Sequence, residues 1–472
     1  MHQQTKLAAA AACVLMTMAG SASAQARNSD LVAIFRDALA NDSVYASARF
    51  TRQAAEERTP QARAAILPNV SAGFGASDEY FKFATSSEPA SVEGVTQQSG
   101  DLVFNGPPGT SINPSYSRTF WTWGPTLQMS MPIYRPQNWD ALDQAKLSVV
   151  GAEATFAQAR QDLILRVAQA YFDLLAARDN LDAIEANKRA VAENLAQAKR
   201  EFEVGTKTIV DTTEAQARFD QIVAQEQVAL GDLIVKRSAL RVIIGRDAGD
   251  LAPLRDSPQL DAPAPADVDA WAKRAEDNNP NVTFALASSQ IAHIETKRNR
   301  DAHLPTLDFV ASAARQRSNG SSTTALQSNI TTGTIGLQLN VPIYSGGLIQ
   351  SRVREALANE ERARSDLETA RRNAAQGARQ AYVGVDFGLA QVRSLESAEV
   401  SAKSQLDSTR TGYQVGVRIN LDVLNATTQL YTTRRDLKKA RYDFLVSGLR
   451  LKSAAGSLDD KDVDAINRLL VR

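Results

Sequence analysis

Met131-Pro132-Ile133-Tyr134 returns later in the chain as Val341-Pro342-Ile343-Tyr344, at an offset of 210 residues (342 − 132). Upstream, Leu67-Pro68 matches Leu304-Pro305 at an offset of 237, and downstream the offset becomes 211. The downstream matches are Ala170-Tyr171 with Ala381-Tyr382, Val204-Gly205 with Val415-Gly416, and Asp211 with Asp422. One single-residue gap and one insertion of 27 residues (237 − 210) therefore align the two halves. A fixed offset over most of a chain indicates one structural unit present twice.

Around these matches the sequence alternates between apolar and small polar side chains. The alternation runs from Trp121 to Ile133 and is repeated from Thr334 to Ile343. Shorter alternating segments precede them at residues 70–76 and 307–313. A period of two residues predicts strands with one apolar face.

The apolar face of these strands has two interpretations. It is either the core of a soluble sandwich, or the lipid-facing side of an outer-membrane barrel with water inside. The polar side is small and uncharged, which favours the barrel. Aromatic residues also occur where an interfacial girdle would lie: Trp121, Trp123, Tyr134 and Tyr344.

A long helix is predicted after each pair of strands, because residues 140–203 and 348–411 contain no proline. Each segment would be about 96 Å long at ~1.5 Å per residue. Apolar residues recur three and four apart, interrupted only at Lys188 in the first unit and at Glu399 in the second. A sustained repeat of 3.5 residues is typical of supercoiled helices. An ordinary two-stranded coiled coil remains an alternative from this feature alone.

Each long helix ends at a Val-Gly pair, and a second helix is predicted to follow. Gly205 and Gly416 suit the position after a helix where the backbone becomes left-handed and reverses. Each unit therefore contains an antiparallel helical hairpin with its tip at that glycine.

Composition argues against an enzyme or a nucleic-acid-binding protein. The 472 residues include 53 Lys and Arg against 53 Asp and Glu, so no basic field indicates nucleic acid. The histidines are His2, His293 and His303, and the one cysteine is Cys13. This content argues against a His/Cys metal centre and a Ser-His-Asp triad. We expect no catalytic activity, no metal and no cofactor.

The first 24 residues resemble a secretory signal peptide. Lys6 is followed by the apolar stretch Leu7–Met18 and by the small-residue cleavage site Ala22-Ser23-Ala24. Cleavage after Ala24 would remove Cys13 and leave a cysteine-free exported protein. Such a protein suits the envelope of a Gram-negative bacterium.

These patterns predict a mainly α-helical chain with membrane strands, organised as two tandem repeats. The expected segments are a signal peptide at 1–24, a first repeat at 25–245, a linker at 246–266, a second repeat at 267–456 and a C-terminal tail at 457–472. In the first repeat we expect strands at about 68–82 and 119–134, and helices at about 29–65, 136–203 and 209–245. In the second we expect strands at about 305–316 and 330–344, and helices at about 267–302, 348–413 and 419–456. Residues 83–118, rich in Ser, Gly and Pro, are expected to form a loop.

Four strands cannot close a barrel, for which about eight strands are the practical minimum. Two chains would give eight strands with a filled interior, whereas three would give 12 and leave room for a pore. The strands therefore predict an oligomer, with the hairpins forming a helical conduit.

The chain resembles the TolC family of outer-membrane efflux and type I secretion ducts. The resemblance is carried by Pro342-Ile343-Tyr344-Ser345-Gly346-Gly347, by Leu163-Ile164-Leu165 with Ala170-Tyr171-Phe172, and by the stretch from Tyr413 to Leu458. It implies a homotrimer with a 12-stranded barrel in outer-membrane lipid and a periplasmic α-helical tunnel. It also implies a passive channel, opened when its periplasmic tip docks onto an adaptor (membrane fusion) protein and an inner-membrane efflux or ABC transporter.

The resemblance assigns roles to the hairpin tips. Asp422 would line the periplasmic constriction, where the family's second acidic position is here Asn425, so the negative ring would be weaker. Asp211, Arg418 and Tyr413 match a latch between hairpins that holds the entrance shut. The adaptor-contact positions would be Val204, Gly205, Val415 and Gly416.

Other interpretations remain open at this level. Asp211 and Asp422 each begin a helix, where an aspartate also serves as a cap. A periplasmic coiled-coil adaptor or structural envelope protein without a barrel is the alternative function, although the strands argue against it. The cargo, whether drugs, metals or a secreted protein, is not determined by the sequence.

Overall fold

The computed structural model describes residues 30–206 except 85–95, 99–100 and 104–114, together with residues 208–256 and 258–471. The predicted signal peptide and the centre of the predicted loop, Gly106–Gly109, lie outside the described residues. The chain divides into two units. The first comprises residues up to 53, 151–286 and 366–472, and the second comprises residues 54–150 and 287–365.

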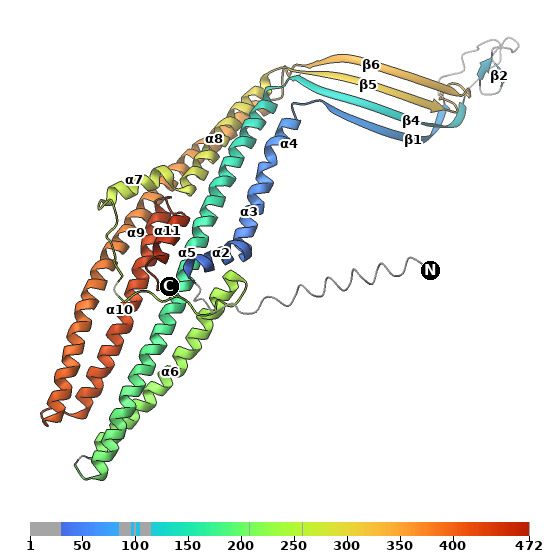
Figure 1. Cartoon of the computed structure of the whole chain (residues 1–472). Coiled ribbons are helices and arrows are strands. Elements are labelled where there is room, and N and C mark those ends of the chain that lie inside the picture. The colour runs from blue at the N-terminus through green and yellow to red at the C-terminus, as the bar shows by residue number, and fades with distance from the viewer. Residues whose placement is uncertain are drawn as a thin grey trace, which may run out of the picture. The chain divides into compact units, whose positions relative to one another are not determined.

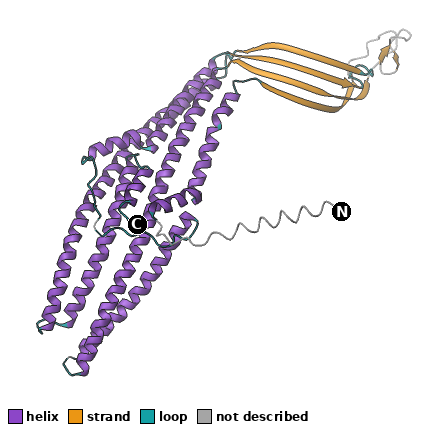
Figure 2. Ribbon diagram, in the orientation of Figure 1, coloured by secondary structure: helices purple, strands orange, loops and turns teal. Residues whose placement is uncertain are grey.

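The second unit contains an antiparallel sheet of four long strands, shown in orange in Figure 2. They are β1 (Asn69–Ala84), β4 (Ser115–Tyr134), β5 (Thr306–Ser318) and β6 (Ser328–Asn340), in the order β1-β4-β5-β6. Two short strands, β2 (Thr96–Gln98) and β3 (Asp101–Val103), pair with each other. Among the described residues β1 and β6 each have one neighbour in the four-stranded sheet, so both present a free edge there.

The register places the predicted apolar side chains of all four strands on one face of the sheet. One row across the sheet is apolar and consists of Val70, Met129, Ala311 and Ile335. The adjacent row is polar and consists of Ser71, Gln128, Ser312 and Thr334. The apolar face is largely exposed in the single chain, with Ile335 78% and Phe74 69% exposed. Gly124 is required in β4, because a Cβ there would lie 1.8 Å from the carbonyl oxygen of Arg315.

The remaining elements are helical, as Figure 1 shows. They are α2 (Leu31–Asn41), α3 (Ser43–Glu56), α4 (Arg58–Ala64), α5 (Pro136–Glu203), α6 (Ile209–Ile244), α7 (Val268–Asn278), α8 (Pro280–Arg300), the 3-10 turn Asp301–His303, α9 (Leu348–Gln414), α10 (Asn420–Ala454) and α11 (Asp460–Asn467). Helices α5 and α6 form one antiparallel hairpin, and α9 and α10 form the other. Among the described residues, no helix is long and apolar enough to cross a membrane.

The core of the first unit is centred on α5. Tyr171 and Phe172 are almost fully buried, and the Phe172 ring stacks on Tyr442 of α10 with centroids 5.4 Å apart. The Tyr171 hydroxyl donates a hydrogen bond to the carbonyl oxygen of Ala252 at 2.8 Å. Burial raises the pKa of Tyr171, so this donor stays protonated. The segment between the repeats is thereby tied to the core.

Two helices predicted as continuous are interrupted, which corrects the expectation for 29–65 and 267–302. At Asp42 the backbone is extended (ψ 118°), and its carboxylate accepts hydrogen bonds from the Tyr45 amide at 2.7 Å and from the Arg166 guanidinium at 3.0 Å. Asn279 is also extended (ψ 130°), since proline at position 280 disfavours a helical residue before it.

The C-terminal tail is folded rather than featureless. Asp459 caps α11, whose Val463 and Ile466 are buried, and Leu470 forms an antiparallel bridge with Leu254. The sequence analysis missed this helix, although an aspartate three residues before Asp462 is a recognisable capping signal.

Candidate functional site

The two hairpin tips have the same backbone structure. Gly205 (φ +77°) and Gly416 (φ +79°) are both left-handed, which glycine adopts without the steric cost of a Cβ. The Thr206 amide donates to the Glu201 carbonyl at 2.8 Å, and the Val417 amide donates to the Gly412 carbonyl at 2.9 Å. These bonds close the ends of α5 and α9 in the same way.

The tips expose apolar side chains to solvent. The most exposed are Val204 at 73%, Val415 at 69% and Val417 at 79%. Ile209 and Ile419, at the starts of the returning helices, are more than half exposed. Isolated exposed valines are ordinary, but a cluster on a turn offers an apolar contact surface.

Both tip aspartates cap the returning helices. Asp211 accepts a hydrogen bond from the Thr208 amide at 3.2 Å, while the Asp211 amide donates to the Thr208 hydroxyl at 3.4 Å. Asp422 accepts from the Ile419 amide at 3.4 Å. Both aspartates therefore serve as helix caps, which was one of the two roles considered for them.

Arg418 lies beside Asp422 rather than beside Asp211 within the chain. Its guanidinium is 3.7 Å from the Asp422 carboxylate, and both side chains are partly exposed. Gly412 makes room for it, since a Cβ there would lie 2.8 Å from Cγ of Arg418. An Asp211–Arg418 ion pair is not formed among the described residues of one chain, so it remains a prediction about neighbouring copies.

Tyr413 connects the two hairpins. Its hydroxyl donates a hydrogen bond of 2.8 Å to the carboxylate of Glu201 on α5, and its ring packs against the small core of the second hairpin. Burial and the Glu201 carboxylate raise the pKa of Tyr413. The sequence analysis missed Glu201, because the contact depends on which faces of α5 and α9 meet.

Two further contacts join the hairpins near their tips. The Arg218 guanidinium of α6 donates to the side-chain oxygen of Asn425 on α10 at 3.1 Å. Leu424 of α10, 2% exposed, packs into the core of the first hairpin with Val191 and Ile222. Asn425, the position where the family pattern has an acid, is thus a contact between hairpins in this chain.

The two interruptions of the apolar stripe are ion-paired within their own hairpins. Lys188 contacts Glu226 at 2.6 Å, and Glu399 contacts Arg434 at 2.8 Å. In the first hairpin the long helix α5 carries the cation and α6 the anion, whereas in the second hairpin α9 carries the anion and α10 the cation. Crossed pairing of the helices would therefore bring like charges together, which disfavours it.

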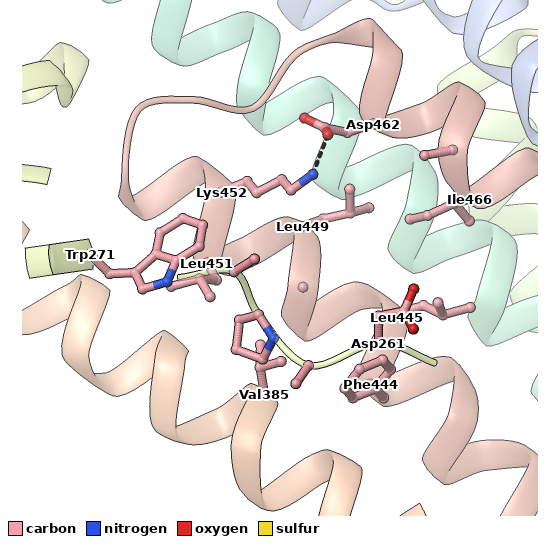
Figure 3. Close-up of a pocket in the computed structure, with 15 residues that line it drawn as sticks. Asp261, Trp271, Val385, Phe444, Leu445, Leu449, Leu451, Lys452, Asp462 and Ile466 are labelled. Atoms are coloured by element: carbon pink, nitrogen blue, oxygen red, sulfur yellow. Dashed lines mark hydrogen bonds and ion pairs between the residues drawn. The ribbon is translucent and has the colours of Figure 1, made fainter. Parts of the chain in front are cut away.

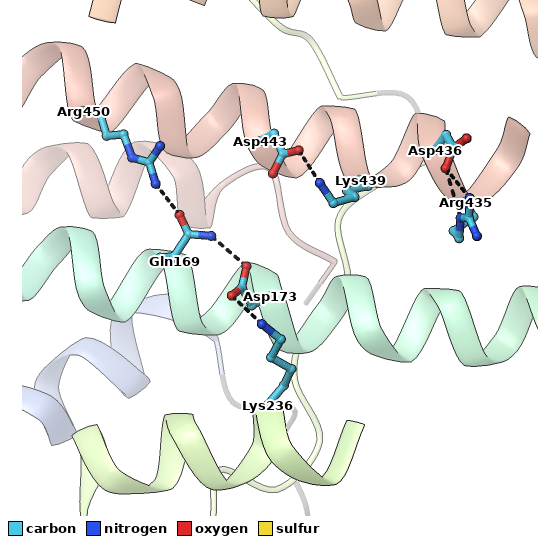
Figure 4. A network of polar contacts seen from close by, with 8 residues as sticks. All are labelled: Gln169, Asp173, Lys236, Arg435, Asp436, Lys439, Asp443 and Arg450. Carbon is cyan, nitrogen blue, oxygen red and sulfur yellow. Dashed lines mark hydrogen bonds and ion pairs between the residues drawn. The ribbon is translucent and has the colours of Figure 1, made fainter. Parts of the chain in front are cut away.

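A polar network farther from the tips connects three helices (Figure 4). The Lys236 ammonium of α6 lies 3.1 Å from the Asp173 carboxylate of α5, and Asp173 also accepts from the Gln169 amide at 2.7 Å. Gln169 in turn accepts from Arg450 of α10 at 2.8 Å. These contacts fix how α6 and α10 pack on α5.

The first unit also contains a pocket of about 320 Å³ (Figure 3). It is lined mainly by apolar side chains, including Trp271, Phe444 and Leu449, and the Lys452–Asp462 ion pair of 2.5 Å lies at its rim. The Trp271 ring nitrogen is already hydrogen-bonded to the Pro265 carbonyl. Its ionisable side chains are Asp261 and the paired Lys452 and Asp462. Among the described residues, no cluster of three or more potential metal ligands occurs.

Comparison with known proteins gives consistent matches over most of the chain. A family model described as Outer membrane efflux protein matches residues 34–246 and 271–457. Outer membrane protein TolC of Vibrio cholerae is 32% identical over 443 residues, covering 93% of each chain. Alkaline protease secretion protein AprF of Pseudomonas aeruginosa is 31% identical over 351 residues, covering 74% of this chain and 73% of that protein. The CmeC outer membrane channel of Campylobacter jejuni has a similar fold, with a TM-score of 0.73 at 18% identity, covering 93% of this chain and 90% of that one.

A sheet with an exposed apolar face, combined with long helical hairpins, defines a class of outer-membrane channel proteins with a periplasmic extension. The chain belongs to the outer membrane efflux protein family. It is an outer-membrane exit duct of the TolC type, and its family consists of channels rather than enzymes.

Proposed function

We propose that three copies of this chain form a 12-stranded barrel in the outer membrane and a tunnel of helical hairpins in the periplasm. The single observation that carries the proposal is the sheet register, which collects the apolar residues of four strands on one exposed face. Lipid would cover this face, while the polar face would line a water-filled lumen. The free edges of β1 and β6 would pair between neighbouring copies, since a closed barrel leaves no edge.

Exposed apolar side chains on two helices support the same assembly. On α6, Ile234 is 69% and Val242 80% exposed, and on α9, Val383 is 47% and Phe387 70% exposed. A contact between the α6 face of one copy and the α9 face of the next would be heterologous, and such contacts form a ring when the rotation between copies closes. This supports hairpins packed side by side around an axis.

The proposed cargo route is type I protein secretion, drug efflux, or both. The relative AprF is named as an alkaline protease secretion protein, which makes a secreted protein a reasonable cargo here. The apolar tips around Val204, Gly205, Val415 and Gly416 would contact a periplasmic adaptor, which in turn would bind an inner-membrane efflux pump or ABC transporter. Docking would open the entrance.

This function is tested by locating and assaying the protein. We expect heat-modifiable, SDS-resistant trimers in the outer-membrane fraction, and channels of defined conductance when the purified trimer is added to a planar bilayer. A monomer found in the soluble periplasmic fraction would instead support the alternative adaptor or structural protein. Co-purification from cross-linked envelopes would then identify the pump and adaptor.

The entrance is proposed to be lined by Asp422 of the three copies. We expect Asp422→Ala to lower cation selectivity and any block by multivalent cations, because it removes three negative charges near one axis. Bilayer recordings under a salt gradient measure this through the reversal potential. The matched control is Asp436→Ala, another partly exposed α10 aspartate, which is paired with Arg435. If Asp422→Ala keeps the full cation preference of the parent, the constriction lies elsewhere.

A further inference from the structure

We propose that the apolar face of the sheet carries a binding site for the phosphate groups of a phosphorylated glycolipid, of the lipid A type, in the outer leaflet. The site consists of Arg315 and Arg317 of β5 with Trp121 and Trp123 of β4, here called the arginine–tryptophan face. This proposal rests on the proposed function, in which lipid covers this face of the sheet. It goes further by naming one lipid that binds there.

The position of the two arginines follows from the strand alternation. Odd-numbered residues of β5 lie on the apolar face, where Leu307, Phe309, Ala311 and Ala313 are followed by Arg315 and Arg317. At about 3.3 Å per residue, Arg315 lies roughly 7 Å beyond Ala313. Arg317 is directly opposite Trp123 of β4. Arg315 and Arg317 therefore lie at the boundary between the apolar residues of the face and its tryptophans.

This end of the sheet is the one away from the helices. Strands β1 and β5 begin after α4 and the 3-10 turn, while β4 and β6 run back toward α5 and α9. The opposite end holds the connections from β1 to β4 and from β5 to β6. With the helices in the periplasm, these connections lie at the outer leaflet, whose glycolipid bears phosphates on its sugar headgroup. An arginine on the lipid face costs much less near an interface than at the middle of the membrane.

Both guanidinium groups are held on the sheet face and remain exposed. Arg317 lies over the Trp123 ring, 5.0 Å from its centroid, and Trp121 stacks on Trp123 with centroids 6.4 Å apart. Arg315 donates from Nε to the side-chain oxygen of Asn329 at 3.2 Å. Within the described residues, neither arginine forms an ion pair with a carboxylate. Their remaining N–H donors can therefore bind phosphate oxygens, to which a guanidinium is well matched.

The charge balance of this end also favours an anion. The same face carries Asp78, opposite Trp121, and Lys82, opposite Ser117. Three cations against one carboxylate give this end of the apolar face a net charge of +2 in each copy. At the helix end of the sheet, Arg135 is instead neutralised by Asp308 at 2.5 Å. The cationic excess in the described strands is thus at the end where the phosphates of the outer leaflet would lie.

The test is native mass spectrometry of the detergent-released trimer with three lipids. They are bisphosphorylated lipid A, lipid A with one phosphate removed, and phosphatidylglycerol. We expect the parent trimer to retain bisphosphorylated lipid A most strongly, and Arg315→Gln with Arg317→Gln to reduce its occupancy at least tenfold. The Lys double variant should keep part of the binding. A control that removes two exposed arginines of α9, Arg354→Gln with Arg371→Gln, should bind like the parent.

Each outcome decides the proposal. Equal retention of all three lipids by the parent, or equal occupancy in the parent and the Gln double variant, overturns it. If the Gln substitutions lower phosphatidylglycerol binding as much as lipid A binding, the face binds anionic lipids in general and the glycolipid assignment is wrong. Trimer heat-modifiability and bilayer conductance are measured in parallel. Intact conducting trimers with unchanged lipid binding overturn this site alone, whereas absence of trimers in the parent overturns the barrel itself.

Discussion

Ile335→Arg is expected to abolish most trimer assembly in the outer membrane. Ile335 lies in the middle of β6, opposite Ala311 of β5, and is 78% exposed on the apolar face. An arginine at the middle of the lipid-facing band costs about 2–4 kcal/mol per copy. A trimer carries the substitution three times, so the total cost is comparable to the whole stability of a typical domain. The measurement is the yield of the heat-modifiable trimer band in outer-membrane fractions.

The neighbouring residue provides the matched control. Thr334 lies on the opposite face of the same strand, opposite Ser312. Thr334→Arg should assemble normally, because its side chain would extend into the water-filled lumen. Leu339→Arg, near the helix end of the band and opposite Leu307, should have an intermediate effect. Equal trimer yields for Ile335→Arg and Thr334→Arg would contradict the assignment of lipid and lumen faces.

The elements that repeat with a simple period could be predicted from the sequence. The alternation around Trp121 and Ile335 indicated strands and their faces, because a strand fixes the side of every second residue. The expected end of the last strand at 344 was wrong, since β6 ends at Asn340 and Ile343 lies beyond it. The proline-free segments and the glycines at 205 and 416 indicated the hairpins. The structure adds that the row Val70–Met129–Ala311–Ile335 crosses all four strands, which a single strand pattern cannot show.

The polar contacts at the tips could not be predicted in the same way. Glu201 is one of many acidic residues on the long helices, and nothing in its sequence neighbourhood distinguishes it. Its contact with Tyr413 depends on how α5 and α9 pack, and the contact of Arg218 with Asn425 depends on how α6 and α10 pack. The family pattern led instead to an Asp211–Arg418 pair, whereas each of these residues contacts its own turn in the single chain.

Tyr413→Phe is expected to raise the single-channel conductance of the isolated trimer. The substitution keeps the ring that packs in the second hairpin but removes the O–H donor to Glu201. A hydrogen bond to a charged group contributes about 1.5–3 kcal/mol. If this bond is made only in the closed entrance, its loss shifts the closed-to-open equilibrium by roughly tenfold or more per copy, since 1.4 kcal/mol corresponds to a factor of ten.

Arg418→Ser should raise the conductance less. The Arg418–Asp422 pair is partly exposed, and such pairs contribute only about 0.2–1 kcal/mol. A large effect of Arg418→Ser would indicate that Arg418 instead pairs with Asp211 of a neighbouring copy in the trimer. Tyr413 is therefore expected to be the stronger part of the latch in this chain.

The latch should also resist alkaline conditions. Burial and Glu201 raise the pKa of Tyr413 above the ordinary tyrosine value of 10.0. The contribution of its hydroxyl to closure is therefore retained through pH 10 and is lost only when the pH rises through the higher pKa of the folded protein. Bilayer recordings of the parent at pH 8 and pH 10 should show the same resting conductance.

The control for Tyr413→Phe is Tyr431→Phe, because the hydroxyl of Tyr431 on α10 has no hydrogen bond to the described residues. Parent-like conductance of Tyr413→Phe, or equal increases in Tyr413→Phe and Tyr431→Phe, would show that the hydrogen bond to Glu201 does not hold the entrance closed.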